Sequence, residues 1–123
     1  NGALDPRALE EAAHALLRCG VHERVIIHFP EGAFAMEPGG QAVFQASLRL
    51  PSGYIKGTVG AGDAFAAGVL YGVHEAMSLK KTLECGVCVA AASLASPGAS
   101  DSVRPISSCR ALAKKYGFQK SLF

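Results

Sequence analysis

The feature that most constrains this chain is a glycine-rich turn, residues 57–68 (GTVGAGDAFAAG), which leads directly into an apolar segment. Gly60, Ala61 and Gly62 carry no bulky side chain, so their successive backbone N–H groups can point at one spot. The apolar run after Asp63 predicts a helix, whose N-terminus adds the positive end of its dipole. The turn therefore predicts an anion site at the start of a helix.

Asp63 can be interpreted in two ways. An aspartate at the start of a helix is a common N-cap, because its side chain can accept a hydrogen bond from the first turn. A carboxylate beside an anion site would instead repel a bound phosphate. That repulsion disfavours simple binding, but it suits a base that takes a proton from a hydroxyl attacking the phosphate. Spacing alone leaves both interpretations open.

The common nucleotide motifs do not fit this turn. A P-loop needs lysine followed by serine or threonine after its last glycine, whereas Asp63 and Ala64 follow Gly62 here. The dinucleotide fingerprint needs a third glycine or alanine at the position that Phe65 occupies. Neither motif accounts for the stretch.

The remaining segments indicate an α/β chain with few strands. The predicted elements are a helix from Asp5-Pro6 to Cys19-Gly20, a buried strand over 24–29, a hairpin of 33–36 and 41–50 around a four-residue turn, and helices over about 63–76, from Ser78 to about 94, and from Ser107 or Ser108 to Tyr116. The second and third helices are too apolar for surface helices, so we expect them to pack on a sheet or on one another.

Composition excludes several classes of function. Twelve basic and ten acidic residues give a net charge of +2, and no basic stripe is interleaved with aromatics, so we expect no nucleic-acid partner. No apolar run approaches the roughly 20 residues of a membrane span, and we expect no membrane partner. The four cysteines are scattered like reduced, buried thiols, and the chain opens without a secretory signal, which favours a cytoplasmic protein.

The glycine-rich stretch resembles the C-terminal signature of the ribokinase-like (PfkB) carbohydrate kinases, Asp-Thr-x-Gly-Ala-Gly-Asp-x-Phe-x-x-Gly. The matching residues are Thr58, Gly60, Ala61, Gly62, Asp63, Phe65 and Gly68. RVIIHFPEGAFAM is similar to the family's strand and nucleotide loop, and ECGVCVAAASLASPGAS to its alanine-rich helix. The resemblance implies the C-terminal, nucleotide-side portion of a ribokinase-like three-layer α/β fold. Residues 1–123 would form part of one kinase domain whose substrate-binding N-terminal part lies outside this chain.

The resemblance also implies an ATP-dependent phosphotransferase acting on a hydroxyl of a sugar or sugar-like molecule. Asp63 would be the catalytic base, and the backbone N–H groups of Gly60, Ala61 and Gly62 the anion hole for the transferred phosphoryl group. Residues implied to contact the nucleotide are Gly32, Thr58 and Val87. Mg²⁺ would bridge the nucleotide phosphates, mostly through water. The chain alone would be inactive.

A departure at Gly57 and several alternatives accompany this resemblance. Gly57 stands where the family usually has an aspartate associated with a monovalent-cation site, so we do not expect a K⁺ requirement. Backbone carbonyls near Val59, Ser93 and Gly98 stay candidates for such an ion. A nucleoside kinase of the same family and a non-catalytic nucleotide-binding or regulatory relative are the alternative functions, and a homodimer is left open.

Two further features have simpler interpretations. His28 lies at the end of the predicted strand and could touch a phosphate, but we expect a hydrogen-bonded structural histidine. Cys85 and Cys88 have metal-ligand spacing, but no second pair accompanies them. They lie on an apolar helix, so we expect core thiols.

Overall fold

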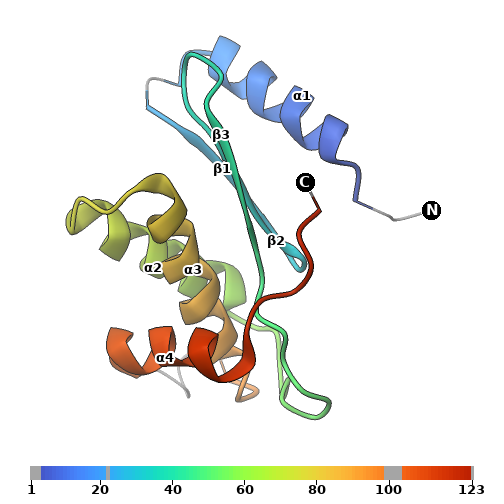
Figure 1. Cartoon of the computed structure of the whole chain (residues 1–123), viewed down its shortest axis with the longest axis vertical. Coiled ribbons are helices and arrows are strands. Elements are labelled where there is room, and N and C mark those ends of the chain that lie inside the picture. The colour runs from blue at the N-terminus through green and yellow to red at the C-terminus, as the bar shows by residue number, and fades with distance from the viewer. Residues whose placement is uncertain (1–3, 22, 99–103, 123) are drawn as a thin grey trace.

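In the computed structural model, a narrow antiparallel sheet separates one helix from three others (Figure 1). The structure describes residues 4–21, 23–98 and 104–122. In chain order the elements are α1 (Pro6–Arg18), β1 (Val25–Phe29), β2 (Gly32–Met36), β3 (Ala42–Ala46), α2 (Ala61–His74), α3 (Leu79–Ser93) and α4 (Ile106–Tyr116). The three layers confirm the predicted α/β class.

Alternation along the strands divides the core between the two faces of the sheet. On one face, Val25, Phe34 and Met36 pack against Leu9 and Ala13 of α1. On the other face, the small side chains of Ala33 and Ala35 form one cluster with residues of α2, α3 and α4. Because successive side chains of a strand point to opposite faces, the one sheet contributes to two separate hydrophobic clusters.

The sheet has the order β1-β2-β3, and the predicted β2–β3 hairpin is confirmed. The third strand ends at Ala46 and not at Leu50, because Leu48 forms a β-bridge with Phe118 at the far end of the chain. A second hairpin joins β1 to β2 through Pro30 and Glu31, and the sequence did not predict it.

Capping chemistry explains where two of the helices begin. The Asp5 carboxylate accepts a hydrogen bond from Arg7 N at 3.0 Å, and the Ser78 hydroxyl accepts one from Lys81 N at 3.2 Å. Both caps were predicted. The prediction for the last helix was wrong: its N-cap is Pro105, whose carbonyl accepts from Ser108 N at 3.0 Å, and neither Ser107 nor Ser108 caps it.

Helices α2 and α3 pack unusually closely, as their apolar composition led us to expect. A Cβ built on Gly68 of α2 would lie 2.6 Å from the Cys85 carbonyl oxygen, and one on Gly72 would lie 2.8 Å from Thr82 Cα. Glycine at these two positions, one turn apart, lets the backbones approach. The opposite side of α2 leaves Leu70 68% exposed.

None of the helices in the described part of the chain has the length and apolar character needed to span a bilayer.

Candidate functional site

The glycine-rich turn leads into α2 without a side-chain cap. Gly60 is the N-cap residue, with φ 83°, a left-handed conformation that favours glycine. Its carbonyl accepts a hydrogen bond from Ala64 N at 2.9 Å, and Ala61 N donates to Thr58 O at 3.3 Å. No side chain bonds to the first turn, so the first backbone N–H groups of α2 have no side-chain acceptor, and that of Ala61 is bonded to the Thr58 carbonyl.

Asp63 is an exposed residue in the first turn of α2 and is not its N-cap. The N-cap interpretation is therefore wrong: the left-handed Gly60 begins the helix earlier than its apolar pattern suggested. The carboxylate lies beside the turn and makes no capping bond to its own helix. Its charge is left available at the positive end of the helix dipole.

A cavity of about 430 Å³ opens beside this turn. Its lining includes His28 at the end of β1, Thr58 and Ala61 from the turn, and Val87 and Ala91 from α3. Thus Thr58 and Ala61 of the turn and Val87 of α3, three predicted site residues, line one space. The volume and the mostly apolar lining suit a small organic ligand.

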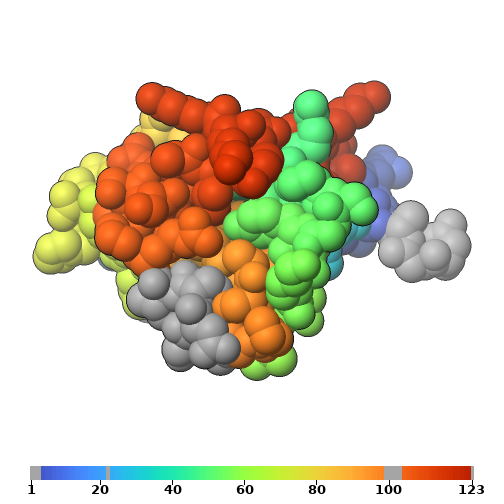
Figure 2. All heavy atoms as spheres, turned by 90° about the horizontal axis from the view of Figure 1, so that it is seen from below, coloured from blue at the N-terminus to red at the C-terminus, as the bar shows by residue number. Residues whose placement is uncertain are grey.

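The segment before the turn is anchored to α3, which positions the cavity wall. The Tyr54 hydroxyl donates to the Ala91 carbonyl at 3.0 Å, and Lys56 N donates to Leu94 O at 2.8 Å. Tyr54 also meets Tyr116 edge to face, with ring centroids 5.6 Å apart. Viewed from below, the green loop before α2 lies beside α4, with the orange end of α3 between them (Figure 2).

His28 is held in the cavity wall by an aromatic contact. Its ring stacks on Phe65 of α2, with centroids 4.0 Å apart and planes 3° apart. Among the described residues the imidazole has no hydrogen-bond partner, so the predicted hydrogen-bonded histidine is wrong on that point. Burial lowers the pKa of His28 below its ordinary value, which keeps the ring neutral near pH 7. No local pattern could have paired residues 28 and 65.

Gly32, the remaining residue expected to contact the nucleotide, does not line this cavity. It is buried at the start of β2, where an added Cβ would clash with the Gln45 carbonyl oxygen and the Phe44 ring on β3. Its absent side chain lets β3 approach β2 closely at the tight β1–β2 turn.

Gly57 packs against the segment that follows α3. A Cβ there would lie 2.7 Å from Pro97 Cα and 3.2 Å from the Ser96 carbonyl oxygen. The space that an aspartate side chain would need is therefore filled by backbone. Of the residues named for carbonyl ligands, Val59 is 63% exposed and Ser93 is buried in the last turn of α3.

The prediction of core thiols at Cys85 and Cys88 is confirmed, whereas Cys19, which was expected to be buried like the other cysteines, is exposed. Cys85 and Cys88 are buried, unpaired thiols of α3, and the Cys85 sulfur contacts the Met77 sulfur at 3.7 Å. Burial raises the pKa of Cys88 to about 12, so this thiol stays protonated. Within the three described ranges, no three His, Cys, Asp or Glu side chains are grouped so as to hold a metal ion.

Comparison with known proteins matches the chain to a family model and to a relative of known activity. A family model described as pfkB family carbohydrate kinase matches residues 2–106. The 1-phosphofructokinase of Escherichia coli (strain K12) is 34% identical over 95 residues, which covers 77% of this chain and 29% of that protein. The chain thus spans less than a third of the length of this relative.

Two solved structures share the fold. Arabidopsis thaliana ribokinase complexed with ribose and ATP matches 89% of this chain and 35% of its own, with 22% identity and a TM-score of 0.79. Phosphofructokinase-2 from Escherichia coli in complex with potassium matches 91% of this chain and 35% of its own, with 20% identity and a TM-score of 0.73. At these identities the likeness concerns the fold.

Proposed function

Because this chain belongs to the pfkB family of carbohydrate kinases, we propose that it forms the nucleotide-side part of an ATP-dependent kinase that phosphorylates a hydroxyl of a sugar or sugar-like molecule. One observation carries the proposal. Thr58, Ala61 and Val87 line one cavity beside the uncapped start of α2, where the exposed Asp63 lies. We also propose that the rest of the kinase domain, including the substrate-binding part, lies outside this chain.

In this proposal the nucleotide lies in the cavity with its base against α3. Val87 and Ala91 offer apolar contact but no specific hydrogen bond to a base, so shape would select the purine. The phosphates would then extend toward the N-terminus of α2. The N–H groups of Gly60 and Gly62 would stabilise the charge that develops on the transferred phosphoryl group, and that of Ala61 would join them by exchanging its bond to Thr58 O.

Asp63 would act as the base. Its carboxylate takes the proton from the acceptor hydroxyl while that oxygen bonds to the γ-phosphorus, and the bond from phosphorus to the ADP oxygen breaks. The products are a phosphate ester, ADP and a proton. The negative charge of Asp63 beside the phosphate site would lower the affinity for a bound phosphate. A protein that only binds nucleotides would gain nothing from this charge, which disfavours a non-catalytic relative. Nothing in this chain favours a nucleoside over a sugar.

The kinase would need Mg²⁺ but no K⁺. The described residues hold no cluster of metal ligands, so a Mg²⁺ ion would depend on the nucleotide phosphates and water, and no step here runs through a protein-held metal. The Pro97 backbone fills the space beside Gly57, which supports the proposal that the kinase needs no monovalent cation.

The direct test is Asp63→Asn in the intact protein. We expect turnover to fall by about 10²- to 10⁴-fold, the usual contribution of a positioned base, while ATP still binds. Glu75→Gln is the matched control, because Glu75 is the C-cap of the same helix and has no place in the proposed reaction. Near-normal turnover of Asp63→Asn in a screen of sugars and nucleosides would refute the assignment.

A further inference from the structure

A second cavity, of about 460 Å³, lies between α3 and α4. The charged side chains of its lining are Lys81 and Glu84 from α3 and Arg110 and Lys114 from α4. We propose that this basic cavity binds the phosphate group of a small organic phosphate monoester, separately from the nucleotide cavity. The proposal does not depend on the kinase activity.

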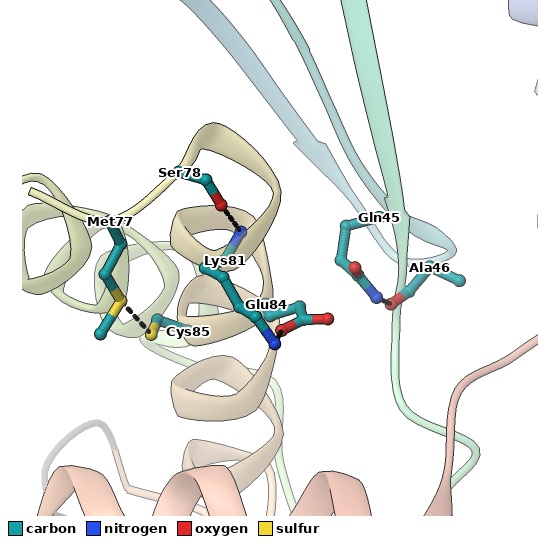
Figure 3. Close-up of polar contacts among 7 residues, drawn as sticks. All are labelled: Gln45, Ala46, Met77, Ser78, Lys81, Glu84 and Cys85. Carbon is teal, nitrogen blue, oxygen red and sulfur yellow. Dashed lines mark hydrogen bonds and ion pairs between the residues drawn. The ribbon is translucent and has the colours of Figure 1, made fainter.

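The charge balance of the basic cavity suits a dianion. Glu84 is already paired with Lys81, with 3.3 Å between Oε2 and Nζ (Figure 3). This pair leaves the cations of Arg110 and Lys114 without a compensating acid on the lining. A phosphate monoester carries nearly two negative charges at neutral pH, which equals the remaining positive charge.

The positions of Arg110 and Lys114 on α4 favour binding of an anion between them. Arg110 and Lys114 are four residues apart, so they lie on one face of the helix and repel each other. The sequence of α4 contains no acidic residue that could offset this repulsion. An anion between the two side chains would relieve it. Arginine can also bind two phosphate oxygens at once through its planar guanidinium.

The remaining lining fits the organic body of the ligand. Cys88, Ala111, Ala113 and Phe118 supply apolar surface, and the Phe118 ring can cover a sugar or base ring. Cys88 stays protonated because of its burial, so it adds no negative charge. Figure 3 shows that Glu84 and Lys81 lie on a different side of α3 from Cys85, which turns toward Met77. The basic cavity therefore has its own face of α3.

The two cavities share their walls. Cys88 of α3 lines the basic cavity, while its neighbour Val87 lines the first one. Likewise, Phe118 lines the basic cavity and its neighbour Gln119 lines the first one. The Gln119 N–H donates to Ser47 O at 2.7 Å. A ligand that orders this shared wall would change the affinity for the nucleotide, a consequence that rests on the proposed function.

Binding would be measured by isothermal titration calorimetry of the intact protein, saturated with a non-hydrolysable ATP analogue so that the first cavity is filled. The probes are inorganic phosphate, AMP and glucose 6-phosphate. We expect saturable binding of at least one ester, tighter than that of inorganic phosphate. AMP and glucose 6-phosphate separate a nucleotide from a sugar phosphate as the source of the phosphate group.

The charge-matched variants decide the location. Arg110→Gln with Lys114→Gln should weaken ester binding by about tenfold or more, since it removes both charge-assisted contacts. Lys115→Gln with Lys120→Gln removes the same charge from residues outside the lining and should leave affinity within about twofold. The proposal is overturned if no ester binds, if both double variants weaken binding equally, or if inorganic phosphate binds as tightly as the esters.

Discussion

Two glycine-to-alanine changes on the same helix test the site and its support separately. At Gly68 the new methyl would lie 2.6 Å from the Cys85 carbonyl oxygen, although ordinary contact begins at 3.4 Å. Helices α2 and α3 would have to separate by roughly 0.8 Å to accommodate it. At Gly62 no atom lies within 4 Å of the added Cβ, so alanine fits.

The expected magnitudes have opposite signs. Overpacking at Gly68 costs about 1–3 kcal/mol, and the better helix propensity of alanine returns at most about 1 kcal/mol. Gly68→Ala should therefore lower the free energy of unfolding by up to about 2 kcal/mol, or up to about 30-fold in the ratio of folded to unfolded protein. Gly62→Ala should leave stability unchanged or raise it by up to about 1 kcal/mol.

The assay combines urea unfolding, followed by circular dichroism, with steady-state kinase turnover. Although it folds normally, Gly62→Ala should lose about tenfold or more in turnover, because its methyl obstructs the N–H groups that face the phosphate. A Gly68→Ala protein more stable than the parent would refute the close packing of α2 on α3. Normal turnover and ATP affinity in Gly62→Ala would refute the anion hole.

Three further predictions concern other parts of the site. Alkylation of the native protein at pH 8 should label the exposed Cys19 far faster than Cys88, because burial raises the pKa of Cys88 to about 12. Rapid labelling of Cys88, followed by mass spectrometry, would contradict the packing of α3. Turnover should be equal in KCl and NaCl, because backbone fills the space beside Gly57, and activation by K⁺ would show that another cation site exists. Burial lowers the pKa of His28, so the unfolded chain takes up the proton first as the pH falls below about 6.5, and the folded state loses stability there. His28→Leu should make this acid-induced loss shallower, and identical pH profiles would contradict the prediction.

The sequence predicted those structural features that depend on residues adjacent along the chain, such as helix caps and the glycine-rich turn. Asp5 and Ser78 cap helices because their side chains reach backbone N–H groups two or three residues away. The glycine-rich turn was predicted for the same reason, since its geometry follows from the missing side chains of Gly60 and Gly62. The family resemblance rested on this stretch, and the match over residues 2–106 confirms it.

Errors arose where distant segments compete for the same backbone. The strand predicted to reach Leu50 ends early because Leu48 forms a β-bridge with Phe118, seventy residues away, through bonds from Arg49 N to Gly117 O and from Gln119 N to Ser47 O. The β1–β2 hairpin was missed because it depends on the close approach of β3 to Gly32. Asp63 was considered as an N-cap because the left-handed conformation of Gly60, which starts the helix earlier, is not visible in an apolar pattern.

The sequence by itself therefore determined the α/β class, the family and the glycine-rich turn that we propose as the phosphate site, because these depend on residues adjacent along the chain. Only the tertiary structure decided which of these residues share a cavity, that Pro97 occupies the space beside Gly57, and that α3 separates two cavities. These properties arise from contacts between segments tens of residues apart. Such contacts depend on how the α2–α3 pair packs on the sheet, and no local spacing records that.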